Sequence, residues 1–225
     1  MTPARKRPVP AADRLPQNGW TVEESHRAAA TRSFPPAERL ELVQGRIAGT
    51  TPPNTWHAGH IPHGGEVLRR AFRPGFHVRG EKPLVIAADR QPQPDLAVHC
   101  APSLDDVARV PEAGGVDLIE EAADASLSSD RTRKAALCAE AGVADYWVPS
   151  QRDHRLEVHR DPGDGMPGQR GCRSITRCTR GMCVSPRTRS GVAIPITDPL
   201  PEGAQPPSQG GPAPPRAEPS IPCHG

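Results

Sequence analysis

Residues 116–147 read VDLIEEAADASLSSDRTRKAALCAEAGVADYW, and this stretch decides the fold. Its first residues predict a buried strand, and the carboxylates of Glu120 and Glu121 lie where that strand ends. A loop and an amphipathic helix over about 131–141 follow, and a second strand begins at Asp145. Carboxylates at the end of an apolar strand are costly to bury unless a cation or a substrate compensates them. We therefore expect the chemistry of the protein in this stretch.

The composition predicts one folded domain with unpacked ends. The chain has 225 residues, which is enough for one domain with a core and tails. Its 29 Pro and 21 Gly exceed average usage, and only 3% of residues are aromatic. We predict a flexible basic Pro-rich arm over 1–18, a folded domain over 19–198 and a disordered Pro/Gly-rich tail over 199–225. The formal net charge of +2 neither favours nor excludes a nucleic-acid partner.

Cysteine spacing and hydropathy predict where the protein is found. The six cysteines form no C-x-x-C pair, and we interpret them as reduced thiols. No apolar run approaches membrane-spanning length, and the basic residues near Met1 are not followed by an apolar core. We therefore expect a cytoplasmic protein with neither a secretory signal nor a membrane anchor.

The N-terminal part of the domain predicts a short helix and a strand pair. In WTVEESHRAAATRS, Thr21 is a plausible N-cap, with acidic residues in the first turn of the helix. RLELVQGRIAGT predicts two strands joined by a turn at Gln44 and Gly45. Glu41 in this pair is most simply a solvent-facing strand residue. It becomes a candidate site residue only if other carboxylates lie close to it in the fold.

A histidine-containing helix is predicted next. HAGHIPHGGEVLRRAFRPG reads as a helix that is interrupted by Pro62 and a glycine pair and ends before Pro74. His57, His60 and His63 recur at helical spacing and could ligate a metal. Because a proline separates the last two and no acidic residue is near in sequence, we favour a solvated polar face.

A carboxylate also lies at the entry of a second buried strand. QPQPDLAVHC runs from a proline-rich turn into a strand with Asp95 at its start. An Asp in that place could merely cap a turn. The strand that carries Glu120 and Glu121 follows about two dozen positions later. Two adjacent strands with carboxylates near the same level can hold a divalent cation, so we predict such a site here.

The remaining segments complete a mixed sheet. DYWV and RLEVHR predict a hairpin across PSQRDH, and CRSITRC, CVS and VAIPI give weak strand signals. A loop is predicted from Asp161 onward. The order strand, helix, strand, strand predicts an α/β (α+β) fold with a mixed β-sheet flanked by helices.

Several of these pieces together resemble the bacterial restriction-endonuclease family (Uma2 type) of the PD-(D/E)XK nuclease superfamily. The resemblance continues weakly to about residue 198. It implies a restriction-endonuclease-like core and metal-dependent hydrolysis of phosphodiester bonds in DNA. The matching pieces are WTVEE, RLELVQGRI, TPP followed by HA, KPLVI, QPQPDLAV, EAADASLSSDRTRKAALCAEAGVADYWV and RLEVHRDP.

The same resemblance implies the site residues. Asp95 and Glu121 would ligate Mg²⁺ or Mn²⁺, and Glu41 would complete or orient the ligand shell. Lys134 would support the developing charge or position the attacking water. DNA is the implied substrate, and a homodimer is expected only from the resemblance.

The chain also departs from the family pattern. Ala123 stands where the superfamily often has its lysine, Glu120 where an aliphatic residue is usual, Ala122 where a valine is usual and Cys138 where an aromatic residue is common. The alternative is therefore a catalytically impaired nucleic-acid-binding or structural relative of the same fold. In a third interpretation each carboxylate is a surface or capping residue. A hydrolase triad is not predicted, because no serine lies in a nucleophile elbow.

Overall fold

The computed structural model describes most of the chain between residues 19 and 197, and its residues form two compact units. Met1–Pro52 and Pro83–Gln93 belong to the first unit, and Pro53–Lys82 and Pro94–Gly225 to the second. The predicted division into an arm, a domain and a tail stays a prediction. The described residues are 19–31, 40–49, 55–101, 110–122, 136, 139–164 and 170–197.

The first unit contains the short helix that the sequence predicts. Helix α1 spans Val22–Ala30. The hydroxyl of Thr21 accepts a hydrogen bond from the backbone N–H of Glu24, and the Glu24 carboxylate accepts one from the backbone N–H of Thr21. This capping box satisfies two backbone donors at the helix start, so the prediction of Thr21 as N-cap is confirmed.

The predicted strand pair of the first unit is also confirmed. Strands β1 (Leu40–Val43) and β2 (Arg46–Gly49) are antiparallel. Gln44 and Gly45 between them both have positive φ, 50° and 73°, which is the conformation of the tight turn that matches strand twist. Two backbone hydrogen bonds also join Leu42 to Gln91, so the hairpin is tied to the 83–93 segment.

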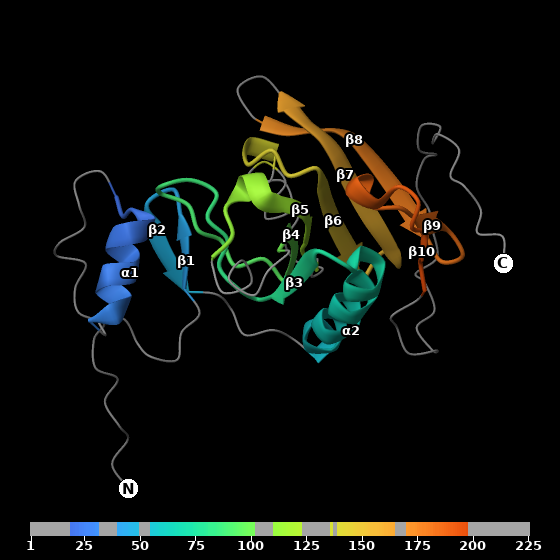
Figure 1. The fold of residues 1–225 in the computed structure, drawn as a ribbon, viewed down its shortest axis with the longest axis horizontal. Coiled ribbons are helices and arrows are strands. Elements are labelled where there is room, and N and C mark those ends of the chain that lie inside the picture. Colours follow the sequence, from blue (N-terminus) through green and yellow to red (C-terminus); the bar gives the residue numbers. More distant parts are fainter. Residues whose placement is uncertain are drawn as a thin grey trace, which may run out of the picture. The chain divides into compact units, whose positions relative to one another are not determined.

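A six-stranded sheet forms the centre of the second unit (Figure 1). Its spatial order is β3-β4-β5-β6-β7-β8. Only β5 and β6 pair in parallel, and the other neighbours are antiparallel, so the predicted mixed sheet is confirmed. The strands are β3 (Phe76–Gly80), β4 (Leu96–Cys100), β5 (Val116–Glu120), β6 (Asp145–Ser150), β7 (Arg155–Asp164) and β8 (Arg170–Thr179).

Short elements complete the second unit. Strands β9 (Cys183–Val184) and β10 (Ile194–Pro195) form a separate antiparallel ribbon. The 3₁₀ turn η1 (Ala113–Gly115) directly precedes β5 in the sequence. A second 3₁₀ turn, η2 (Arg187–Arg189), lies between β9 and β10 in the sequence. The loop predicted from Asp161 does not begin there, because β7 continues to Asp164, and residues 165–169 lie outside the described residues.

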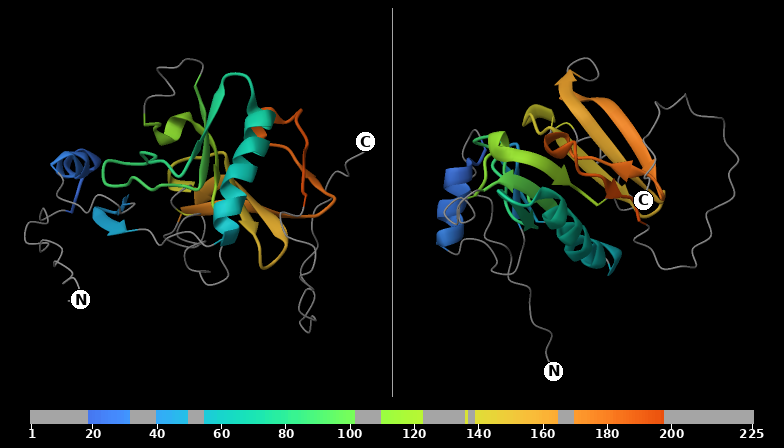
Figure 2. Two further views of the ribbon diagram at one scale, coloured as in Figure 1. Left: turned by 90° about the horizontal axis from the view of Figure 1, so that it is seen from below. Right: turned by 45° about the vertical axis from the view of Figure 1, so that its right-hand side comes forward.

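Helix α2 (Thr55–Phe72) lies against one face of this sheet (Figure 2). It runs without a break through Pro62, which differs from the predicted interruption. A proline inside a helix costs about 3 kcal/mol. Burial of a Leu or Phe side chain contributes about 1.5–3 kcal/mol each, and Leu68 and Phe72 are both 1% exposed. Packing on the sheet therefore offsets the cost of Pro62.

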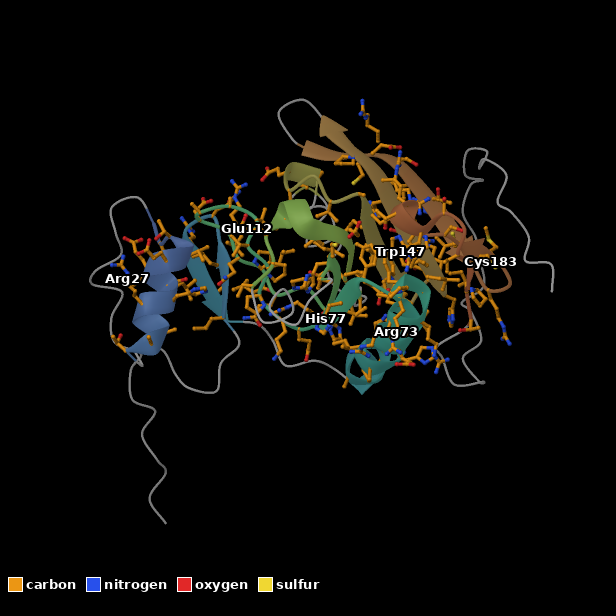
Figure 3. The ribbon with its side chains drawn as sticks, viewed as in Figure 1. Arg27, Arg73, His77, Glu112, Trp147 and Cys183 are labelled. Atoms are coloured by element: carbon orange, nitrogen blue, oxygen red, sulfur yellow. The ribbon has the colours of Figure 1, made fainter. Side chains whose placement is uncertain are left out.

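The core lies between α2 and the sheet. Trp147 from β6, labelled in Figure 3, packs in the same cluster as Leu68 and Phe72 from α2. Val98 from β4 and Leu118 from β5 belong to the same cluster. The core therefore holds α2 against β3 and β4, with side chains of β5 and β6 in the same cluster.

Part of the predicted helix over about 131–141 lies outside the described residues. Ala136, Ala139 and Glu140 are helical, in agreement with the prediction. Lys134 lies outside the described residues. Among the residues that the structure describes, no helix is long and apolar enough to cross a membrane.

One cysteine differs from the predicted reduced state. Cys183 is disulfide-bonded, whereas Cys100, Cys172 and Cys178 are free thiols. Spacing along the chain does not show which sulfur atoms meet in space, and for this reason the sequence did not reveal the bond.

Asp145 at the start of β6 joins three elements of the second unit. Its carboxylate, 1% exposed, accepts hydrogen bonds from Nε of Arg160 at 2.6 Å and from the backbone N–H of Arg187. The indole N–H of Trp147 also donates to it, at 3.2 Å. Because a buried charge requires such partners, Asp145 ties β6 to β7 and to the turn at η2.

We predict that Asp145→Asn destabilises the protein by about 3 kcal/mol, since removal of one charge leaves Arg160 without its carboxylate partner. The matched control is Asp161→Asn. Asp161 pairs with Arg187 at 2.7 Å but its side chain is 42% exposed, and its φ of 55° suits Asn. The control should lose less than about 1 kcal/mol. Urea unfolding measures both, and equal losses would contradict the structural role of Asp145.

Candidate functional site

Asp95 and Glu121 occupy neighbouring ends of two paired strands. Asp95 directly precedes β4, and Glu121 directly follows β5. In the antiparallel register Leu96 lies opposite Glu120, so Asp95 and Glu121 are the next residues at the same strand ends. Both are buried, at 6% and 7% exposure. The sequence prediction that β4 and β5 are adjacent and carry carboxylates near one level is confirmed.

The Asp95 carboxylate is held from two directions. Nε2 of His57 on α2 lies 2.9 Å from its Oδ1. The backbone N–H of Ala122 donates to its Oδ2 at 2.8 Å. The backbone N–H of Glu121 meanwhile donates to the carbonyl of Trp147 at 3.0 Å, which extends the β5–β6 pairing by one residue. These bonds fix the chain on both sides of the strand ends.

His57 responds to the negative charge of this cluster. Its hydrogen bond to Asp95 raises the pKa of the imidazole above its ordinary value. Burial opposes this rise, and the charges of Asp95, Glu121 and Glu81 add to it. The imidazole therefore stabilises buried carboxylates.

Glu120 points to the α2 side of the sheet and has its own histidine. Its Oε1 lies 2.9 Å from Nε2 of His60, and both side chains are 8% exposed. Gly64 on the next turn of α2 leaves room for this pair, because a Cβ there would lie 2.9 Å from Oε1 of Glu120. The buried carboxylate at this position, where the family usually has an aliphatic residue, is thus compensated by a hydrogen bond.

His57 and His60 correct the prediction of a solvated polar face. Their spacing on the helix was visible, but their acidic partners are 38 and 60 residues away in sequence. Only His63 of the three is exposed. The helical spacing of histidines opposite strand-end carboxylates is the one signal that could have revealed these pairs.

Glu41 belongs to the first unit and lies on β1. Its Oε1 accepts a hydrogen bond from the backbone N–H of Gln93 at 3.1 Å. The side-chain amide of Gln93 donates to the carbonyl of Leu40 at 2.8 Å. Glu41 therefore anchors the segment that ends two residues before Asp95 in the chain. The convergence of Glu41 with Asp95 and Glu121 stays a prediction, as does the role of Lys134.

The donor chemistry of Asp95 and Glu121 fits a hard divalent cation. Mg²⁺ is usually bound by one or two carboxylates together with waters and phosphate oxygens. Within the described residues no group of three or more His, Cys, Asp or Glu is arranged for a metal, and a site of the Mg²⁺ type does not require one. A carboxylate has about four lone-pair sites, so Asp95 keeps acceptor capacity beside its two hydrogen bonds.

Two carboxylates of the cluster, Asp95 and Glu120, are paired with histidines. In the part of the chain that the structure describes, neither of them forms a salt bridge with Lys or Arg. Buried carboxylates close together repel one another, and a divalent cation relieves that repulsion.

Comparison with known proteins places the chain in a family. The family model described as "Uma2: Putative restriction endonuclease" matches residues 22–174. The chain belongs to this Uma2 family. The match includes Glu41, Asp95, Glu121 and Lys134.

A solved structure has the same fold as this Uma2 chain. It is described as a putative nuclease belonging to DUF820 from Anabaena variabilis. The two are 18% identical, the TM-score is 0.57, and the likeness covers 80% of this chain and 97% of the other. At this identity the likeness shows the fold alone, which is the predicted α+β architecture. A search of curated proteins found no match.

We predict opposite effects of two alanine substitutions on α2. At Gly59 an added Cβ meets nothing within 4 Å, so Gly59→Ala should stabilise the protein by about 0.5–1 kcal/mol through helix propensity. At Gly64 the Cβ would press on Glu120 and on Cδ1 of Leu96, so Gly64→Ala should destabilise it by about 1–3 kcal/mol.

Thermal or urea unfolding of both variants measures the difference. Stabilisation of similar size by both substitutions would show that the Glu120–His60 pair does not need the space that Gly64 leaves.

Proposed function

We propose that this Uma2-family chain is a metal-dependent endonuclease that hydrolyses phosphodiester bonds in DNA, with Mg²⁺ or Mn²⁺ held by Asp95 and Glu121. The observation that carries the proposal is the pair of buried carboxylates at the adjacent ends of β4 and β5. Family membership adds support, because the family description reads "Putative restriction endonuclease". The fold shared with the Anabaena variabilis protein described as a putative nuclease is consistent with the proposal.

The bound cation would supply activation of water and neutralisation of charge on the scissile phosphate. The chain's own residues position it. His57 and the N–H of Ala122 hold the two oxygens of Asp95 in a fixed orientation, so that little reorganisation is needed when substrate binds. Glu121 begins the segment after β5 and presents the second carboxylate.

Two further residues belong to the proposal. Glu41 would complete or orient the ligand shell. Lys134 would stabilise negative charge that develops on the phosphate, in place of the lysine that is absent at Ala123. A cytoplasmic location, expected from the hydropathy of the sequence, and a homodimer, expected from the resemblance, belong to the same proposal.

The alternative is a nucleic-acid-binding relative without efficient turnover. The engagement of both Asp95 oxygens by His57 and Ala122 favours it, because a cation must share those oxygens with existing hydrogen bonds. Ala123 also favours this alternative, because an uncharged alanine stands where the superfamily often has its lysine.

We predict that the purified protein cleaves plasmid DNA in Mg²⁺ or Mn²⁺ and not in EDTA. Asp95→Asn and Glu121→Gln should each lower the cleavage rate by about 100-fold or more, since each removes a ligand charge. Glu66→Gln is the matched control, because Glu66 is an exposed residue of α2 that pairs only with Arg70 among the described residues. Equal cleavage by all variants would indicate a contaminating nuclease. DNA binding by the wild type without cleavage would favour the alternative.

Glu41 and Lys134 are tested separately. We predict that Glu41→Gln and Lys134→Met each lower the rate at saturating Mg²⁺ by about tenfold or more. If Glu41 orients the metal shell, Glu41→Gln should also raise the Mg²⁺ concentration needed for half-maximal rate, whereas Lys134→Met should leave it unchanged. A normal rate in both variants, with circular dichroism equal to that of the wild type, would remove these residues from the site.

A further inference from the structure

A mainly apolar cavity of about 110 Å³ opens at the surface of the second unit. Its walls come from α2, from β6 and the turn before β7, and from the β9–β10 ribbon. Val67, Trp147 and Ile194 belong to its apolar lining. Neither Asp95 nor Glu121 is among the described residues that line it, so it is distinct from the proposed cation site. Apolar surface that is open to solvent in this way is typical of a binding place.

The chain itself leaves the described part of the structure at this cavity. Ile196 and Thr197, the last described residues, both line it. Residues 198–225 lie outside the described residues, and they begin with the sequence DPLPE. Leu200 cannot lie more than about 11 Å from Thr197, since each residue of an extended chain spans at most about 3.3–3.6 Å. The first aliphatic side chain after Thr197 is therefore within reach of the cavity.

The volume and the walls of the cavity suit this side chain. An apolar cavity of about 150 Å³ holds benzene, which has six carbon atoms. In proportion, about 110 Å³ holds about four carbon atoms, as many as a Leu side chain has. Leu200 is flanked by Pro199 and Pro201, which favour an extended backbone. Grooves with aromatic walls bind extended proline-rich segments, and Trp56 and Trp147 supply such a wall here.

The charges around the cavity are complementary to the same segment. Asp198 and Glu202 flank the apolar residues PLP. Arg180 lines the cavity and is exposed, and it forms no ion pair with the residues that the structure describes. Arg155 also lines the cavity but is already paired with two carboxylates. An acidic flank near Arg180 therefore adds a modest, salt-screened attraction to the apolar contact.

We propose that residues 198–202 fold back onto this cavity and that the side chain of Leu200 occupies it. The inference goes beyond the proposed function and does not depend on it. The occupant is a segment of the same chain, because the described chain ends at the rim of the cavity and continues with a side chain of matching size. The segment would cover the apolar walls and hold the β9–β10 ribbon against α2.

The three tryptophans of the chain report on the cavity. Trp56 and Trp147 line it, whereas Trp20 belongs to the first unit. In the ¹⁵N-labelled protein, Leu200→Ala should shift the indole N–H resonances of Trp56 and Trp147 and leave that of Trp20 in place. The matched control is Ile221→Ala, because Ile221 is the only other Leu, Ile or Val in 198–225. The control should shift none of the three resonances.

A variant that fills the cavity tests the same contact from the other side. Val67→Phe places a ring in the cavity and leaves the sequence of 198–202 unchanged. A Glu-specific protease should then cut after Glu202 about tenfold faster than in the wild type, because the segment can no longer dock. Arg70→Phe adds the same ring at a side chain that is 77% exposed, and it should leave the rate unchanged. Mass spectrometry of the released fragment measures the rate.

Each other outcome overturns the proposal. Indole resonances of Leu200→Ala that equal those of the wild type would do so, as would unchanged cleavage in a folded Val67→Phe. An effect of Leu200→Ala that depends on protein concentration would assign the cavity to a second copy of the chain. A shift caused by Ile221→Ala alone would assign it to a later part of the segment. If Val67→Phe does not fold, the substitutions in 198–225 still decide the question.

Discussion

Burial of carboxylates at the ends of β4 and β5 is the constraint on which the rest of the second unit depends. Asp95, Glu120 and Glu121 are each at most 7% exposed. A buried charge costs several kcal/mol unless hydrogen bonds or opposite charge compensate it. Helix α2 supplies that compensation through His57 and His60. The helix can do this only if it stays unbroken and close to the sheet, and the apolar contacts of the core provide both conditions.

The sequence predicted the framework of this arrangement because local patterns determine it. The apolar runs around 96–100 and 116–120 are typical of buried strands, and each is bordered by a carboxylate. The capping box at Thr21 and the Gln44–Gly45 turn are likewise determined by residues that are close together in the sequence. Strand pairing then brings Asp95 and Glu121 to the same edge, because β4 and β5 are neighbours in an antiparallel register.

The parts that the sequence did not predict depend on contacts between distant residues. The partners of His57 and His60 are far away in the chain, so the helix face was interpreted as solvated. Asp145 meets Arg187 only because the turn at η2 folds back onto β6, 42 residues later. The cavity between α2, β6 and the β9–β10 ribbon is built from separate segments of the chain, so no local pattern of the sequence reveals it. A glycine in a helix normally indicates weakness, yet Gly64 leaves space for a buried carboxylate.

The central claim is that Asp95 and Glu121 together form a cation site. Titration calorimetry with Mn²⁺ tests it without any substrate. The account predicts that each wild-type chain binds one Mn²⁺ and that Mg²⁺ competes with Mn²⁺ for the site. Both Asp95→Asn and Glu121→Gln should lose Mn²⁺ binding, while their circular dichroism spectra stay equal to that of the wild type. Unchanged Mn²⁺ binding in the two folded variants, or no binding by the wild type, would contradict the claim.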